Sequence, residues 1–164
     1  MFPTDDTIVA ISTAAGTAAR AIVRLSGPEA LPLAAGAFDP SGEPLERLGG
    51  FHCADGVVAI RPAGITVPGR AYVFRAPRSY TRQDVVELHV PGAAVVATAL
   101  CDALTSAGAR AAEPGEFTAR AFFSGRIDLS RAEAVADVIH AADAAQLRLA
   151  TSALEGEVHR LCAA

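Results

Sequence analysis

The chain has 164 residues, of which 51% are hydrophobic and 20% are charged, and its formal net charge is −4. This length allows one ordinary domain with a core and room for an appendage, and the composition excludes a disordered tail. The negative net charge does not favour non-specific binding to nucleic acid. We expect a soluble, cytoplasmic protein, because the three cysteines are scattered and the sequence has neither a signal-peptide pattern nor a long apolar run.

Short β-branched segments bounded by turns predict strands in the first two thirds of the chain. The expected strands cover residues 7–11, 21–25, 51–60, 71–75 and 85–90. A helix is expected to start at 26–28, where Pro28 suits a first turn, and the alanine- and valine-rich run 92–106 predicts a second helix. The stretch 39–50, rich in proline, glycine and charged residues, predicts a loop.

The last third of the chain has helical periodicity only. The segment Gly125–Leu129 joins a short amphipathic helix to a longer one, and Ser130 with Glu133 matches a capping box at the start of the second. Apolar residues then recur at spacings of three and four toward Leu161, which predicts one helix of about 30 residues. Such a helix cannot bury its apolar stripe alone, so we expect a partner from this chain, another copy or a further domain.

Charged residues at alternating strand positions are the candidates for binding chemistry. Glu87 and His89 share the strand face opposite to their apolar neighbours, and Arg24 has the same position in its own strand. Such residues either line a pocket or lie on a solvated sheet face, and the pattern alone favours the solvated face. Arg126 adds a cation, with compensation of charge at a helix C-terminus as its competing role.

The sequence contains no motif typical of a metal site or of a nucleotide-binding site. The histidines show no metal-ligand spacing and no CxxC pair accompanies them. Cys53 and His52 are adjacent on one predicted strand and therefore face opposite ways, which argues against a Cys–His dyad. Because no Gly-x-x-x-x-Gly-Lys-Ser/Thr loop is present, we expect no GTP hydrolysis by this chain.

Three blocks of the sequence follow one another at separations typical of a known family. They run from Asp6 through Pro28, from Ser79 through His89 and, most specifically, from Pro114 through Ile139. With weaker similarity up to Gly156, they resemble the MnmE (TrmE) tRNA-modification GTPases over nearly the whole chain. The resemblance implies an α+β fold: residues 1–118 would form a tetrahydrofolate-binding and dimerisation domain like that of the glycine-cleavage T-protein, and residues 119–164 would begin a helical domain.

The same resemblance assigns ligands and partners. Arg24, Glu87 and Arg126 fall on the family's folate-contacting positions, and the implied ligand is 5-formyl- or 5,10-methylene-tetrahydrofolate. A carboxylate can accept two adjacent N–H donors of a pterin ring, and arginine can bind the glutamate tail. The family acts as a homodimer with the flavoprotein MnmG and delivers the one-carbon unit to the wobble uridine of certain tRNAs.

Some parts of the family pattern are not found in this sequence. GTP, Mg and K belong to the family's GTPase domain, which is missing here together with the terminal cysteine motif. We therefore expect the chain to be a fragment or a truncated homologue.

The chain also departs from the usual family pattern at several positions. It has Thr17 where arginine is usual, Arg82-Gln83 where Gly-Glu is usual, and Val90-Pro91-Gly92-Ala93 where Cys-His-Gly-Gly is usual. These changes leave an alternative open, a ligand-free dimerisation or interaction module with a decayed folate pocket. A free-standing one-carbon transfer enzyme is a third interpretation, but no general-acid pair accompanies Glu87.

Overall fold

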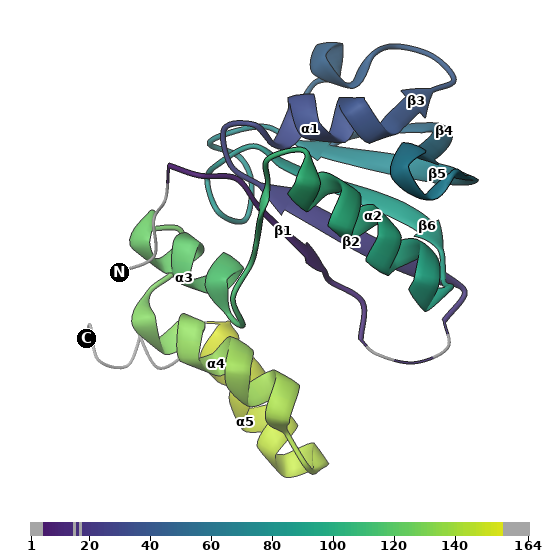
Figure 1. Ribbon diagram of the computed structural model, residues 1–164. Helices are drawn as coiled ribbons and strands as arrows, with labels where there is room; N and C mark the ends of the chain where they lie inside the picture. Colours follow the sequence, from purple (N-terminus) through teal and green to yellow (C-terminus); the bar gives the residue numbers. More distant parts are fainter. Residues whose placement is uncertain (1–4, 15, 17, 156–164) are drawn as a thin grey trace. The chain divides into compact units, whose positions relative to one another are not determined.

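The computed structural model of the chain describes residues 5–14, 16 and 18–155. The chain forms two compact units, the first ending at Glu113 and the second beginning at Pro114 (Figure 1). The domain boundary expected between residues 118 and 119 remains a prediction. The α+β class is confirmed, because a mostly antiparallel sheet is followed by a run of helices.

Among the described residues, the first unit contains one seven-stranded sheet with the order β3-β4-β5-β6-β2-β1-β7. Its strands are β1 (Ile8–Ile11), β2 (Arg20–Ser26), β3 (Phe38–Pro40), β4 (His52–Ile60), β5 (Ile65–Phe74), β6 (Val85–Pro91) and β7 (Arg110–Ala111). Its helices are α1 (Ala30–Ala37) and α2 (Ala94–Ser106), with short 3-10 turns η1 (Leu45–Arg47) and η2 (Arg61–Ala63). Neighbouring strands pair antiparallel, except that β1 and β7 run parallel.

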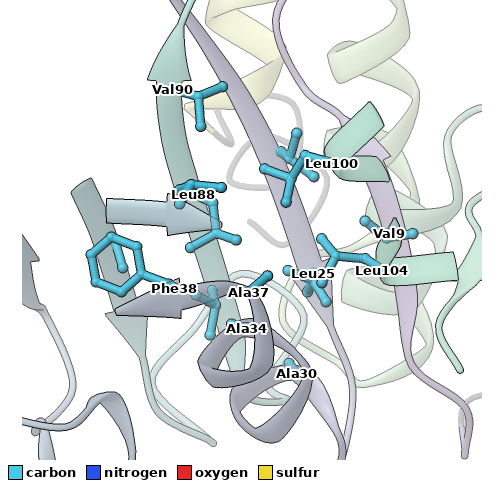
Figure 2. Close-up of a cluster of buried hydrophobic side chains, with 14 of the residues drawn as sticks. Val9, Leu25, Ala30, Ala34, Ala37, Phe38, Leu88, Val90, Leu100 and Leu104 are labelled. Carbon is cyan, nitrogen blue, oxygen red and sulfur yellow. The ribbon is translucent and has the colours of Figure 1, made fainter. Parts of the chain in front are cut away.

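The core lies on the sheet face that α1 and α2 cover (Figure 1). Val23, Leu25 and Leu88 alternate along β2 and β6 with residues that point to the opposite face, and each is fully buried beneath the helices. Leu100 and Leu104 of α2 pack into the same cluster (Figure 2). Burial of one such leucine stabilises the fold by about 1.5–3 kcal/mol, which fixes the face that each strand turns to the helices and leaves the alternate residues on the other face.

The five predicted strands are confirmed with shifted ends, but the predicted loop at 39–50 is partly wrong. Phe38–Pro40 forms β3 against β4, and Leu45–Arg47 forms η1. Phe38 and Leu45 are 2% and 1% exposed, so apolar anchoring gives this stretch a structure that its proline and glycine content hides. The helix expected from 26–28 begins at Ala30, after a turn closed by the Ala30 amide and the Gly27 carbonyl.

The second unit holds α3 (Glu116–Phe123), α4 (Leu129–His140) and α5 (Ala144–Leu154). The expected single helix from Ser130 toward Leu161 is therefore wrong in its described part, and Leu161 lies outside the described residues. The chain leaves the helical conformation at Ala141, where ψ is 119°, and Asp143 then caps α5 by accepting hydrogen bonds from two backbone amides at 2.8 Å. As a result α5 packs against α4 as a helical hairpin.

The expected capping box at the start of α4 is also wrong. The N-cap is Asp128, whose Oδ1 accepts a hydrogen bond of 2.9 Å from the Arg131 amide. Ser130 lies inside the first turn, so its hydroxyl is past the position that serves a cap. Within the described chain, no helix is both long and apolar enough to cross a membrane.

Candidate functional site

Arg24 and Glu87 meet on the sheet face opposite to α1 and α2. The antiparallel register of β2 and β6 places the two residues directly across from each other. Arg24 Nε and Nη2 each lie 2.8 Å from Glu87 Oε1, within the range of charge-assisted hydrogen bonds. The arginine side chain is 30% exposed and the glutamate side chain 17%, so the pair is shielded but accessible.

His89 and Tyr72 complete the surroundings of the carboxylate. His89 Nε2 lies 3.4 Å from Glu87 Oε2, which is longer than an ordinary hydrogen bond. Tyr72 of β5 is opposite Glu87 in the sheet register, and its ring lies 4.6 Å from the His89 ring, centroid to centroid. One oxygen of Glu87 is thus bound by Arg24, while the other has the longer contact to His89.

This arrangement is suited to binding a planar group with adjacent N–H donors. A carboxylate has about four lone-pair positions, and the two contacts from Arg24 Nε and Nη2 both go to Oε1 of Glu87. Tyr72 and His89 offer ring surfaces beside the carboxylate, as a flat heterocycle requires. The alternation in the sequence predicted the face of Glu87, but Tyr72 was missed, because its place beside Glu87 depends on the register between β5 and β6.

Arg126, the third predicted site residue, belongs to the second unit. Gly125 has a φ of 70° and ends the turn after α3, and the Arg126 amide donates to the Ala121 carbonyl at 2.8 Å. The Arg126 side chain is exposed. The structure brings Arg24 and Glu87 together and places Arg126 at a helix C-terminus, a position where a cation is favourable whatever else it does.

Several residues of the matching sequence blocks have structural contacts. Ser26 and Thr81, both buried, share a hydrogen bond of 2.7 Å between their hydroxyl oxygens, and Ser26 Oγ also lies 3.3 Å from Gln83 Oε1. Asp84 Oδ1 accepts a hydrogen bond of 2.8 Å from the Ala76 amide. These contacts hold the loop between β5 and β6 in place, so Gln83 has a structural partner despite the departure from the family pattern.

A second structural pair explains part of the most specific block. Arg120 Nη2 and Glu116 Oε1, one turn apart in α3, lie 3.1 Å apart with side chains 1% and 0% exposed. Removing one partner of a buried pair costs about 3–5 kcal/mol, because the other charge stays buried. Glu116 and Arg120 are therefore assigned to the stability of the fold.

The residues after β6 have a tight backbone contact of their own. A Cβ on Gly92 would lie 1.8 Å from the Ala18 carbonyl oxygen, so only glycine fits there. Pro91 ends β6 opposite Arg20, and Ala93 precedes α2. Gly92 therefore approaches the backbone of this same chain. Thr17, another position that departs from the family pattern, lies outside the described residues.

Metal ligation has no candidate in the described part of the chain. No group of three or more histidine, cysteine, aspartate or glutamate side chains lies in an arrangement that holds an ion there. Burial raises the pKa of the Cys101 thiol, with a smaller effect from Asp102, so this cysteine is a poor nucleophile. His159 and Cys162 lie outside the described residues.

Comparisons with known proteins agree on one family. A family model described as GTP-binding protein TrmE N-terminus matches residues 7–126. The tRNA modification GTPase MnmE of Bacillus subtilis is 43% identical over 158 residues, covering 95% of this chain and 34% of the relative. The proteins of the same name from Syntrophotalea carbinolica and Chlorobium chlorochromatii are 44% identical over 154 residues and 42% identical over 159 residues. They cover 94% and 95% of this chain, and the chain covers 34% and 33% of them, so it spans about a third of these curated relatives.

Proposed function

This chain belongs to the family of GTP-binding protein TrmE N-termini, and we propose that it is the tetrahydrofolate-binding, dimer-forming module of a protein that modifies the wobble uridine of tRNA. The relatives are named tRNA modification GTPases, which supports a role in tRNA modification. In this proposal, GTP hydrolysis, tRNA binding and cooperation with the flavoprotein MnmG require the two thirds of the full-length relatives that this chain does not cover. This module supplies the one-carbon unit as 5-formyl- or 5,10-methylene-tetrahydrofolate.

The observation that carries the proposal is the position of the Arg24–Glu87 pair. Two neighbouring strands hold both side chains in register on the face away from the helices, at 30% and 17% exposure. Within the described part of the chain, Glu87 Oε2 has a single contact, at 3.4 Å to His89 Nε2, so the carboxylate can turn to accept pterin N–H donors. Arg24 holds the carboxylate in place by cross-strand hydrogen bonds, and Arg126 is proposed as a further ligand cation.

A ligand-free interaction module is the second candidate. It is favoured by one observation, the direct bond of Glu87 to Arg24, since a charged pair that satisfies itself needs no ligand. The two candidates differ in one measurable property, the affinity of the chain for folate.

Calorimetric titration of the 164-residue chain with 5-formyltetrahydrofolate tests the proposal. The wild type is expected to bind, and Glu87→Ala should lose about 2–4 kcal/mol of binding free energy, because pterin donors lose their charged acceptor. Glu87→Gln should also fail, since an amide has one acceptor oxygen, and Arg24→Lys should bind only in part, since an ammonium lacks the planar fork.

Glu43→Ala is the matched control, because Glu43 is an exposed carboxylate in the loop between β3 and β4. It should bind folate like the wild type. If the wild type gives no binding heat at millimolar folate, the ligand-free module is the better account. If Glu87→Ala binds as tightly as Glu43→Ala, the assignment of Glu87 is wrong.

A further inference from the structure

An open pocket of about 300 Å³ lies on the same sheet face as Arg24 and Glu87. Its lining includes Arg20, Asp55, Pro68, Arg70, His89 and Pro91. These residues face each other across neighbouring strands, since Arg20 is opposite Pro91, Arg70 is opposite His89 and Asp55 is opposite Arg70. The pocket is therefore built by the sheet register and not by a loop.

The pocket carries an excess of positive charge. Arg70 binds both oxygens of Asp55, with Nε to Oδ1 at 2.6 Å and Nη2 to Oδ2 at 2.8 Å. The Arg70 hydrogen bond holds the pKa of the Asp55 carboxyl below its usual value, and the charge of Arg20 acts in the same direction. The lining thus holds one carboxylate and two guanidinium groups, and Arg20 is exposed. Such a site attracts an anion.

The pocket and the Arg24–Glu87 pair form one continuous strip. His89 lines the pocket and also approaches Glu87, with Nε2 at 3.4 Å from Oε2. Arg20 and Arg24 lie on the same face of β2, four residues apart, which corresponds to about 13 Å along a strand. A ligand whose polar ring binds at Glu87 would therefore direct its opposite end, beyond a spacer, toward Arg20 and Arg70.

We propose that this pocket binds the glutamyl carboxylates of the folate tail, so that the chain prefers folates with several glutamates over those with one. The inference rests on the proposed folate-binding function and extends it from the ring of the ligand to the far end of its tail. A pterin ring needs hydrogen-bond acceptors, which Glu87 supplies, whereas a glutamyl tail is an oligoanion and needs cations. Because the pocket is open on one side, a longer tail can continue into solvent after its first carboxylates are bound.

The test compares 5-formyltetrahydrofolate carrying one glutamate with the same folate carrying three, by calorimetry at low salt. The wild type should bind the triglutamyl form roughly fivefold more tightly, a ratio that high salt reduces. Arg20→Gln and Arg70→Gln should each bring the ratio to below about twofold. Asp55→Asn should raise the ratio above that of the wild type, because it removes the carboxylate that competes for Arg70.

Arg61→Gln is the matched control, because Arg61 is exposed in η2 and lines a different pocket, beside α1 and α2. Its ratio should equal that of the wild type. A wild-type ratio of one, with the monoglutamyl form bound, would overturn the tail pocket and leave the proposed function intact. Equal ratios in Arg20→Gln, Arg70→Gln and the wild type would also overturn it. Loss of binding to both folates by the wild type would contradict the proposed function itself.

Discussion

Arg82 has a φ of 60° in the loop between β5 and β6, a left-handed conformation that an L-residue with a side chain adopts at a cost. Its side chain is exposed, and the family resemblance of the sequence implies glycine at this position. The loop is held by buried contacts of Ser79 and Thr81, which supply the stability that offsets this strain.

Substitution of Arg82 by glycine should therefore stabilise the chain. We expect Arg82→Gly to raise the free energy of unfolding by about 0.5–1 kcal/mol, because the relief of the left-handed conformation exceeds the added entropy of the unfolded chain. Urea denaturation measures the change. Arg82→Ala is the control and should change little, since alanine keeps the strain; a stabilisation as large as that of glycine would show that the side chain, not the backbone, is unfavourable.

For single residues, sequence patterns predicted the sheet face to which a side chain points, but they did not predict which residues of other strands lie beside it. The alternation of Val86, Glu87 and Leu88 predicted that the glutamate side chain points away from the core. The burial of Val86 and Leu88 confirms this orientation. Whether Arg24 lies across from Glu87 or from His89 depends on the register between strands 63 residues apart in sequence, and no local pattern reports it. Tyr72 was missed for the same reason.

At the scale of elements, the start of α4 gives a clear prediction. Asp128→Ala should cost about 1 kcal/mol of unfolding free energy, because the Arg131 amide loses its side-chain acceptor at the N-cap. Ser130→Ala should change it by less than about 0.5 kcal/mol, since Ser130 follows the cap. Thermal or urea unfolding of both variants checks this. A larger loss for Ser130→Ala would restore the capping box that the sequence suggested.

The break between α4 and α5 shows why helix boundaries were predicted poorly. The apolar stripe continues through Ala142 and Ala145 without a change of spacing, so periodicity alone gives one helix. The signal was present in Asp143 and Gln146, because Asp143 caps α5 and Gln146 Oε1 accepts a hydrogen bond of 2.9 Å from the Ala142 amide. In the sheet, β3 was missed because three residues are too few for alternation to appear.

At the scale of the whole molecule, the fold class and the family could be predicted, because strand and helix signals occur in separate parts of the sequence and three blocks carry the resemblance. The expectation of a dimer rested partly on an uncovered helix of about 30 residues, and the α4–α5 hairpin weakens that argument. Ile139 and Leu149 nevertheless remain 73% and 74% exposed, which keeps apolar surface available for a partner.

A homodimer of this chain therefore remains a proposal with a direct test. Sedimentation equilibrium at micromolar concentration should give twice the chain mass of 16.8 kDa. Leu149→Glu, which places a charge on the exposed apolar surface, tells whether α5 contributes to the contact. A dimer unchanged by Leu149→Glu would locate the interface elsewhere, and a monomer mass for the wild type at every concentration would contradict the proposal for this chain.

Binding of folate by the Arg24–Glu87 pair can be seen in a crystal structure of the chain with 5-formyltetrahydrofolate. We expect pterin N–H groups within hydrogen-bond distance of the Glu87 carboxylate, on the sheet face opposite to α1 and α2, and a tail that runs toward Arg20 and Arg70. Folate bound at another surface, with the 2.8 Å bonds between Arg24 and Glu87 unchanged and nothing in contact with them, would show that this pair is not the folate site.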